Sequence, residues 1–419
     1  MSTPKPAVVL FGGLAVAWNQ RYLRVLAECG IAALIVDRGG PHAEALLSGD
    51  LSHVAGFAAA DPEDHAVVAD VVAGWAERFA VVGVACLVEQ YVLPAAIAAD
   101  LLGVPSPGLR AATVCRDKHL QRRFLAEWSP RSQRAGSGEP RFPVILKPAG
   151  RLASSGVRFV PDAAGLETAL AEYGPDEVLL LEEPVRGPEF SVESLSVDGV
   201  VGYAEITGKR TTGLDSGFFV ELGHTTPAPG LDEPARAALL DTHHAVLDRL
   251  GFGTGVAHAE YRLDDSGRPV LIEIAARPPG DSIMALHWLA TGVSLEEAYL
   301  RAVLGEPAEL PPPTRVARQV YLDHPAGVLT DVEVAPELGV GVHWFSPGEV
   351  HAQIATCAER DDDATVRCVL ALKPSGTELV PLRESGDRAA MFVIDAPSVA
   401  ELDELERRCR AGVRVRAGS

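Results

Sequence analysis

Runs of consecutive apolar residues alternate with amphipathic segments in the first part of the chain. Such runs are typical of strands buried on both faces, and their alternation with helices predicts a parallel β-sheet covered on both sides. The strands are expected at residues 7–11, 31–36 and 81–88, and the helices before Gly30 and at residues 63–79.

Ligands of such sheets bind beyond the carboxyl ends of the strands. Gly12-Gly13, Asp37 and Glu89 fall at these ends. Gly12-Gly13 lacks the GxGxxG spacing, which makes dinucleotide binding a weak interpretation. Glu89 is a candidate substrate contact, and capping of the next helix is the alternative.

Shorter strands dominate the pattern beyond residue 110. A helix carrying Arg116-Asp117-Lys118 is followed by a loop at 129–143, and the next strands are expected at 142–148, 157–160, 177–185 and from 189 to 206. Residues 149–156, between two of these strands, are small and polar, so they offer backbone N–H groups and hydroxyls to a phosphate chain. Residues 208–213 are expected to form a mobile loop, in which Lys209 either reaches phosphate or lies in a solvated turn.

The stretch from 258 to 277 carries the strongest chemical signal. Two alternating runs flank Asp264-Asp265-Ser266-Gly267, which predicts a β-hairpin. Alternation places Glu260 on one face of the first strand, and Glu273 and Arg277 on one face of the second. Two neighbouring carboxylates require a cation between them, and Mg²⁺ with nucleotide phosphates is the usual one. A pair of surface cross-strand charges is the alternative.

Composition and charge narrow the class of protein. The chain has 419 residues, 47% of them hydrophobic, and a formal net charge of −20, which argues against nucleic-acid binding. No apolar run approaches the ~20 residues needed to span a bilayer. The six cysteines lack CxxC spacing and are expected to be reduced thiols. These features favour a cytoplasmic enzyme without a membrane partner, and they permit a homodimer.

Lysine is rare in this chain. Of 37 basic residues only five are lysines, namely Lys5, Lys118, Lys147, Lys209 and Lys373. Arginine evidently supplies the generic positive charge, so the interior lysines are candidates for holding phosphate as compact point charges.

The order of these motifs resembles that of the ATP-grasp superfamily, and specifically its carboxylate–amine ligases of the L-amino-acid (dipeptide) ligase type. The similarity extends over about residues 5–310 and rests on Lys118, Leu146-Lys147-Pro148, Ser154-Ser-Gly156, Leu181 to Val192, His258-Ala-Glu260 and Ile272-Glu273 to Arg277. The resemblance implies an α/β fold of ATP-grasp architecture. An N-terminal parallel-sheet, Rossmann-like domain (1–110) would precede an ATP-grasp domain (111–310) with a lid lobe at about 141–187 and a central antiparallel sheet. A small C-terminal α/β lobe (311–419), in which no chemical motif is recognisable, would follow.

The resemblance also implies roles for individual residues. Lys118 and Lys147 would clamp the phosphates of ATP, with Lys147 also catalytic, and Arg277 would steady the acyl phosphate. Glu260 and Glu273 would hold one or two Mg²⁺ ions, or Mn²⁺. Many ATP-grasp enzymes have asparagine where this chain has Ala275, which implies more water around the second ion. The remaining nucleotide contacts would be Ser154, Ser155 and Gly156 in the lid, Glu182, Glu183 and Val185 at the adenine hinge, and Glu189 at the ribose.

The implied activity is formation of an amide through an acyl phosphate, with release of ADP and phosphate. The substrates would be small carboxylates and amines, with amino acids expected, and they would be contacted by Glu89, Glu221, His224 and Arg277. His258 is expected to support the metal ligands by a hydrogen bond, and Asp281 to cap the next helix, with a pocket role as the alternative. Two other functions remain open, a formate- or bicarbonate-activating ligase of nucleotide metabolism and a non-catalytic ATP-binding regulatory protein.

Overall fold

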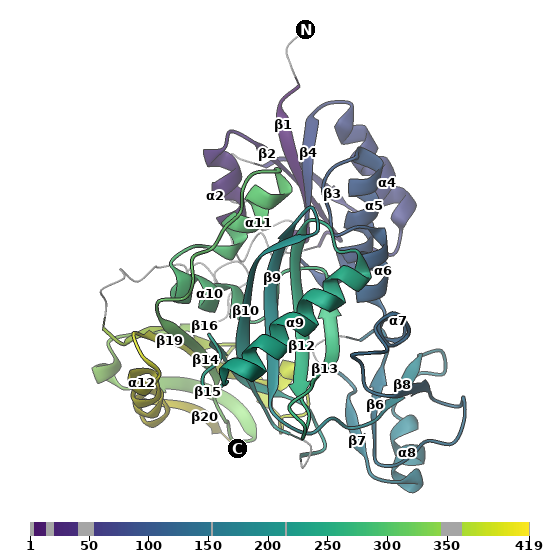
Figure 1. The fold of residues 1–419 in the computed structure, drawn as a ribbon. Coiled ribbons are helices and arrows are strands. Elements are labelled where there is room, and N and C mark those ends of the chain that lie inside the picture. Colours follow the sequence, from purple (N-terminus) through teal and green to yellow (C-terminus); the bar gives the residue numbers. More distant parts are fainter. Residues whose placement is uncertain are drawn as a thin grey trace.

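The computed structural model describes residues 4–13, 21–40, 54–151, 154–213, 216–344 and 363–418. These residues form a mixed α/β molecule built on four sheets (Figure 1). The predicted fold class is confirmed, with a parallel sheet at the N-terminus and antiparallel sheets beyond it. No helix among the described residues is long and apolar enough to cross a membrane.

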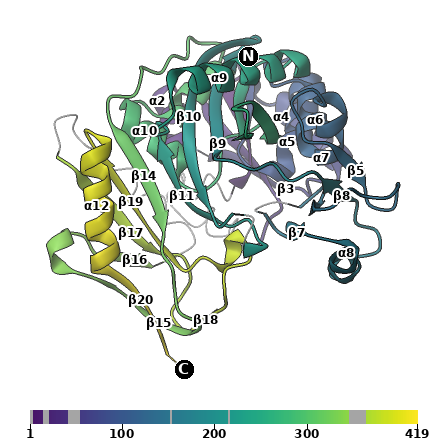
Figure 2. The same cartoon turned by 60° about the horizontal axis from the view of Figure 1, so that its bottom comes forward.

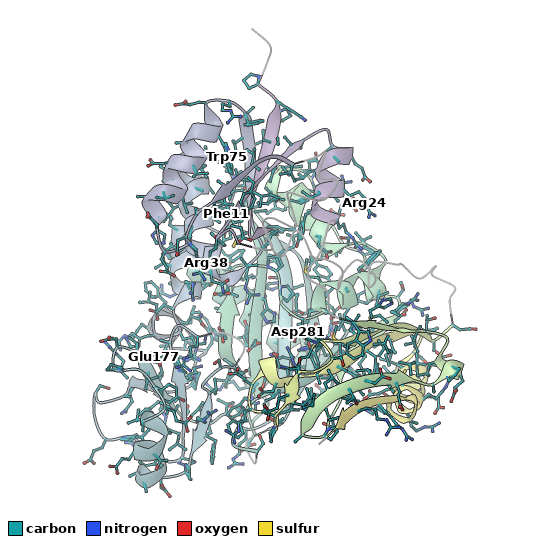
Figure 3. All side chains as sticks on the ribbon, turned by 180° about the vertical axis from the view of Figure 1, so that it is seen from behind. Phe11, Arg24, Arg38, Trp75, Glu177 and Asp281 are labelled. Atoms are coloured by element: carbon teal, nitrogen blue, oxygen red, sulfur yellow. The ribbon has the colours of Figure 1, made fainter. Side chains whose placement is uncertain are left out.

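The N-terminal sheet is parallel and has the strand order β3-β2-β1-β4. Its strands are β1 (Pro6–Phe11), β2 (Ala32–Asp37), β3 (Val54–Ala59) and β4 (Ala80–Cys86). Alternate residues of β1 enter two separate cores. Phe11 packs on the side of Trp75 in α4 (His65–Ala76), and Leu10 on the side of α2 (Arg21–Glu28) (Figure 3). The sequence pattern predicted β1, β2 and β4 but missed β3, whose residues are mostly half-buried.

Three helices and a short turn lead from this sheet to the rest of the molecule. They are η1 (Glu89–Tyr91), α5 (Val92–Leu102), α6 (Leu109–Arg116) and α7 (Lys118–Phe124). The single helix predicted around Lys118 is broken at Asp117, whose carboxylate accepts hydrogen bonds from the backbone N–H groups of His119 and Leu120. This N-cap starts a new helix and places Lys118 in its first turn.

A small antiparallel sheet with the order β5-β8-β6-β7 forms a lobe at one side (Figure 2). It consists of β5 (Ser132–Arg134), β6 (Val144–Pro148), β7 (Arg158–Val160), β8 (Leu179–Glu182) and the helix α8 (Ala163–Leu170). We call residues 132–182 the lid lobe. Its β5 lies within the segment predicted as a loop, because a three-residue strand carries too little pattern to be recognised.

The central sheet has nine strands in the order β13-β12-β9-β10-β11-β14-β19-β17-β16. Its first five strands in this order are β13 (Pro269–Ala275), β12 (Gly255–Leu263), β9 (Glu189–Val197), β10 (Val200–Thr211) and β11 (Glu221–Thr226). The helix α9 (Glu233–Leu250) lies across one face of these strands (Figure 1). The fully buried Tyr261 of β12 shares a core with Val246 and Leu250 of this helix.

The rest of the chain completes the central sheet and adds a fourth sheet of order β18-β15-β20. The elements are α10 (Ile283–Thr291), α11 (Leu295–Val303), β14 (Val316–Tyr321), β15 (Gly327–Val334), η3 (Pro336–Leu338), β16 (Val342–Trp344), β17 (Thr365–Ala371), β18 (Glu378–Leu379), η4 (Ser385–Asp387), β19 (Ala390–Ala396), α12 (Val399–Gly412) and β20 (Val413–Gly418). Because β14 pairs with β11, the central sheet continues through residue 310 into the C-terminal lobe. The division of the chain into three domains stays a prediction.

Candidate active site

One cavity lies between the lid lobe and the central sheet, and most of the residues predicted to bind nucleotide and metal line it. They are Lys118, Lys147, Ser154, Ser155, Glu182, Glu183, Val185, Glu189, Glu260 and Glu273, and they are joined by Glu221 and Lys209. These residues come from α7, from the lid lobe and the segment that follows it, and from strands β9 to β13. Their roles stay predictions, but the structure brings them to one place.

The two predicted metal ligands face each other across the β12–β13 hairpin. Glu260 and Glu273 are directly paired in the strand register, with an irregularity just after Glu260. Each carboxylate has a lysine partner, since Lys209 Nζ lies 2.5 Å from Glu260 and Lys118 Nζ 2.8 Å from Glu273. Burial disfavours ionisation of Glu260, but Lys209 and His258 outweigh it and hold its pKa well below the usual range. Two ionised carboxylates in one cavity are a donor set that fits a hard divalent cation.

His258, two residues before Glu260 in β12, contacts two carboxylates. Its Nδ1 lies 2.8 Å from the fully buried carboxylate of Glu193, and its Nε2 lies 3.5 Å from Glu260. Burial opposes protonation of this imidazole, but Glu193 and Glu260 raise its pKa to about 9. His258 therefore lies between two carboxylates, one of which is the predicted metal ligand Glu260.

Lys147 belongs to a buried ion cluster formed by the lid lobe and α7. Its Nζ lies 2.7 Å from Glu182, whose carboxylate also accepts hydrogen bonds of 2.7 and 3.1 Å from Arg122. Burial and the Arg122 guanidinium lower the pKa of Lys147 to about 8, although Glu182 acts in the opposite direction. Burial would raise the pKa of Glu182, but the two cations lower it to about 2.

The ion cluster occupies the side chain of Glu182, which leaves the backbone of this residue for the predicted contact with adenine. Both carboxylate oxygens are engaged by cations, so the side chain holds Lys147 in place and is not free to contact a base. Sequence reasoning missed Arg122, because an arginine four residues after Lys118 on a short helix belongs to no recognisable motif.

The lid loop approaches the cavity through Ser154 and Ser155. The loop turns at Gly156, which has a φ of +71°. A Cβ at Gly156 would lie 2.9 Å from the Arg151 guanidinium and 3.0 Å from the Tyr173 ring. The backbone conformation therefore favours glycine, and a Cβ would also displace the Arg151 side chain and crowd the Tyr173 ring. Residues 152 and 153 lie outside the described residues.

The prediction of a mobile loop around Lys209 is wrong. The predicted mobile loop at 208–213 is largely the end of β10, where Lys209 pairs with Glu189 on one side and His224 on the other. The Lys209 side chain is only 1% exposed and contacts Glu189, Glu221 and Glu260. The prediction failed because a segment with glycine at both ends is typical of a turn, whereas pairing with two neighbouring strands determined the actual conformation.

Glu189 begins β9 and has two cationic neighbours. Arg262 Nη2 lies 2.5 Å and Lys209 Nζ 3.2 Å from its carboxylate. A carboxylate that lines the cavity and is held in this way fits the predicted contact with a ribose hydroxyl.

The four predicted substrate residues form two groups. In the first group, Arg277 Nε donates a 2.6 Å hydrogen bond to Glu89. This bond links the residues that follow β13 to the residues that follow β4 of the N-terminal sheet. In the second group, His224 Nε2 lies 2.9 Å from Asp281, and Arg388 lies 2.9 Å from Asp281 and 3.6 Å from Glu221.

The sequence did not predict the contact between Asp281 and Arg388. Asp281 does not cap the following helix. The residue at the cap position of α10 is Ser282, and Asp281 has a φ of 54° and pairs with Arg388. Figure 3 shows Asp281 where the central sheet meets the C-terminal lobe. The lobe in which no chemical motif was recognised thus contributes an arginine beside Glu221.

Residues 140–285 match the family model of the ATP-grasp domain. The alanine–anticapsin ligase of Bacillus subtilis (strain 168) is 25% identical over 269 residues, which are 56% of this chain and 57% of that protein. The D-alanine–D-alanine ligase of Gloeobacter violaceus is 28% identical over 229 residues, which are 49% of this chain and 74% of that protein.

The solved structure of an L-amino acid ligase from Bacillus licheniformis has the same fold. Its TM-score is 0.78 at 21% identity, and the match covers 100% of both chains. A phosphoribosylglycinamide synthetase from Anaerococcus prevotii matches with a TM-score of 0.70 at 14% identity, over 99% of this chain and 100% of that one.

The predicted resemblance is confirmed by the match of residues 140–285 to the ATP-grasp domain. The alignment with the alanine–anticapsin ligase covers less than two thirds of the length of that protein.

Proposed function

We propose that this protein is an ATP-dependent ligase that activates a carboxylate, that of an amino acid, as an acyl phosphate and joins it to an amine. The products are an amide or dipeptide, ADP and phosphate. The observation that carries the proposal is the paired Glu260 and Glu273 in one cavity with Lys118 and Lys147, within a segment that matches the ATP-grasp domain. The names of the relatives, which are amino-acid ligases, support the class of substrate.

Lys118 and Lys147 hold the phosphates of ATP in this proposal. Both ammonium groups line the cavity, and both are tied to carboxylates that orient them, Glu273 and Glu182. The main chain from 182 to 185 contacts the adenine, while Glu189 accepts hydrogen bonds from the ribose. Ser154, Ser155 and Gly156 close over the phosphates and exclude water, which would hydrolyse an acyl phosphate.

Glu260 and Glu273 hold Mg²⁺ or Mn²⁺, one or two ions. A divalent cation there neutralises the charge that develops on the transferring phosphoryl group. Ala275 follows Glu273 by two residues, is buried and has no side-chain oxygen, so the protein contributes few ligands besides the two carboxylates. Mg²⁺ tolerates this because it commonly retains several waters.

The carboxylate substrate attacks the γ-phosphorus, which turns one of its oxygens into a leaving group. The amine then attacks the acyl carbon, and phosphate departs with that oxygen. Arg277 stabilises the negative charge on the acyl phosphate and on the tetrahedral intermediate electrostatically. Glu89 holds the guanidinium of Arg277 in position through its 2.6 Å hydrogen bond.

The two groups of substrate residues provide both signs of charge. A zwitterionic amino acid needs a carboxylate for its ammonium group and a cation for its carboxylate. Glu89 and Arg277 form one such pair, and Glu221 with Arg388 forms the other, next to His224 and Asp281. This arrangement favours amino acids over formate or bicarbonate, which carry no ammonium group.

The test is ATP consumption with Mg²⁺ and a panel of amino-acid pairs, with mass spectrometry of the product. The proposal expects ADP and phosphate, both dependent on two amino acids, and a new amide mass. Glu260→Gln should abolish turnover, whereas the same substitution at the surface residue Glu297 should leave it unchanged. Formation of AMP and pyrophosphate would contradict the proposal, and nucleotide binding without turnover on any acid and amine would favour a regulatory protein.

A further inference from the structure

Lys209 is the most completely neutralised cation of the candidate site. Its ammonium lies 2.5 Å from Glu260, 2.9 Å from Glu221 and 3.2 Å from Glu189, and its side chain is 1% exposed. An ammonium has three N–H donors and no acceptor. Lys209 donates one of these to Glu260 and forms ion pairs with Glu221 and Glu189, so three carboxylates surround its ammonium.

The three carboxylates come from three strands and have different tasks in the proposed function. Glu260 is a proposed metal ligand, Glu189 a ribose contact and Glu221 a substrate contact. Each has a second cationic neighbour, namely His258 at 3.5 Å, Arg262 at 2.5 Å and Arg388 at 3.6 Å, respectively. Among the described residues, Lys209 is the one cation that all three share.

A divalent cation and the Lys209 ammonium compete for Glu260. Lys209 contacts Oε1 of Glu260, so a divalent cation on that carboxylate would lie close to the ammonium, and two cations at such a distance in a buried site repel each other strongly. Metal binding at Glu260 therefore requires Lys209 to give up that contact. The ammonium then has one unused donor, which is costly in a buried position unless a new anion accepts it.

Lys209 also lines the cavity that contains Lys118 and Lys147, so a nucleotide phosphate in that cavity is within the range of a flexible four-carbon side chain. We propose that Lys209 is a resident counter-ion of the metal site. It neutralises Glu260 in the ligand-free protein and transfers one hydrogen bond from Glu260 to a nucleotide phosphate when metal and nucleotide arrive together. The inference rests on the proposed function for the assignment of Glu260 as metal ligand.

The consequence is that the protein binds a divalent cation poorly until nucleotide is present. Without Lys209, the carboxylates of Glu260, Glu221 and Glu189 would face one another with less positive charge between them. Such a set of oxygens is itself a good site for a divalent cation. Removal of Lys209 should therefore strengthen metal binding to the nucleotide-free protein, whereas removal of Lys147, whose ammonium pairs with Glu182 and not with a proposed metal ligand, should not.

The test is Mn²⁺ binding to the full-length, nucleotide-free protein, followed by electron paramagnetic resonance of the free ion. We expect Lys209→Met to bind Mn²⁺ about tenfold or more tightly than the wild type. Lys5→Met, at an exposed lysine, should behave as the wild type. Equal Mn²⁺ affinity of Lys209→Met and the wild type would overturn the inference.

Two double variants control for misfolding of Lys209→Met and for metal binding at another place. Lys209→Met combined with Glu221→Gln has less repulsion among the carboxylates, and it should still bind Mn²⁺ more tightly than Glu221→Gln alone. Lys209→Met combined with Glu260→Gln should lose the gain, and retention of the gain would show that the metal binds elsewhere. Because these measurements use no substrates, their failure is distinguishable from a failure of the ligase reaction.

Discussion

Replacement of Glu182 by glutamine tests the buried cluster that holds Lys147. Glu182 is 4% exposed and accepts hydrogen bonds from Arg122 and Lys147. Glutamine has the same shape but no charge, so two buried cations would lose their shared counter-ion. Breaking a buried ion pair from one side typically costs about 3–5 kcal/mol.

The pKa of Glu182 gives an independent magnitude. It falls from 4.5 to about 2, a difference of about 2.5 units. At about 1.4 kcal/mol per unit, ionised Glu182 stabilises the fold by about 3 kcal/mol. Because the folded-state pKa is the lower one, this contribution is complete above pH 4.5 and is lost as the pH falls through about 2. The two magnitudes agree.

The assay is urea unfolding at pH 7, followed by circular dichroism, with Glu183→Gln as the matched control. Glu183 is the next residue, but its side chain is 36% exposed and its partner Arg131 is 71% exposed. An exposed pair of this kind contributes less than about 1 kcal/mol. Equal unfolding midpoints for the two variants would refute the structural role given to Glu182.

Three other predictions concern nucleotide and substrate binding. The pKa of Lys147 is about 8 in the ligand-free protein, so ATP binding should weaken as the pH rises through 8. Calorimetry at pH 9 in buffers of different ionisation enthalpy should detect proton uptake by Lys147 when ATP binds. An ATP affinity that does not change with pH would contradict this prediction. Gly156→Ala should weaken ATP binding by about tenfold through strain and crowding, whereas Gly136→Ala, which has a similar positive φ but open space around its Cβ, should bind as the wild type. Arg388→Met should raise the KM of one amino-acid substrate by about tenfold or more with little change in the KM of ATP, and an unchanged KM for both amino acids would exclude Arg388 from the substrate site; the exposed Arg383→Met is its control.

Local patterns in the sequence predicted the metal hairpin well. Alternation on both sides of Asp264-Asp265-Ser266-Gly267 determines which residues share a face, and the structure pairs Glu260 directly with Glu273. The buried strands of the N-terminal sheet were predictable for the same reason, because a continuous apolar run needs no knowledge of its neighbours.

Contacts between distant segments were not predictable from one sequence. Lys209 was assigned to a loop because its neighbours are glycine, arginine and threonine, yet strand pairing on both sides buries it. Arg388 reaches Asp281 across 107 positions of the chain, and Arg122 reaches Glu182 across 60. No spacing rule connects such residues, so only the fold reveals that they meet.

The central claim is the acyl phosphate, and the transfer of an oxygen atom tests it most directly. The carboxylate substrate, labelled with ¹⁸O in both oxygens, is incubated with the protein, ATP, Mg²⁺ and the amine, and the phosphorus products are analysed by mass spectrometry. Our account predicts one ¹⁸O atom in the inorganic phosphate for each amide formed and none in the nucleotide. Label in AMP, or amide formation with unlabelled phosphate, would contradict it.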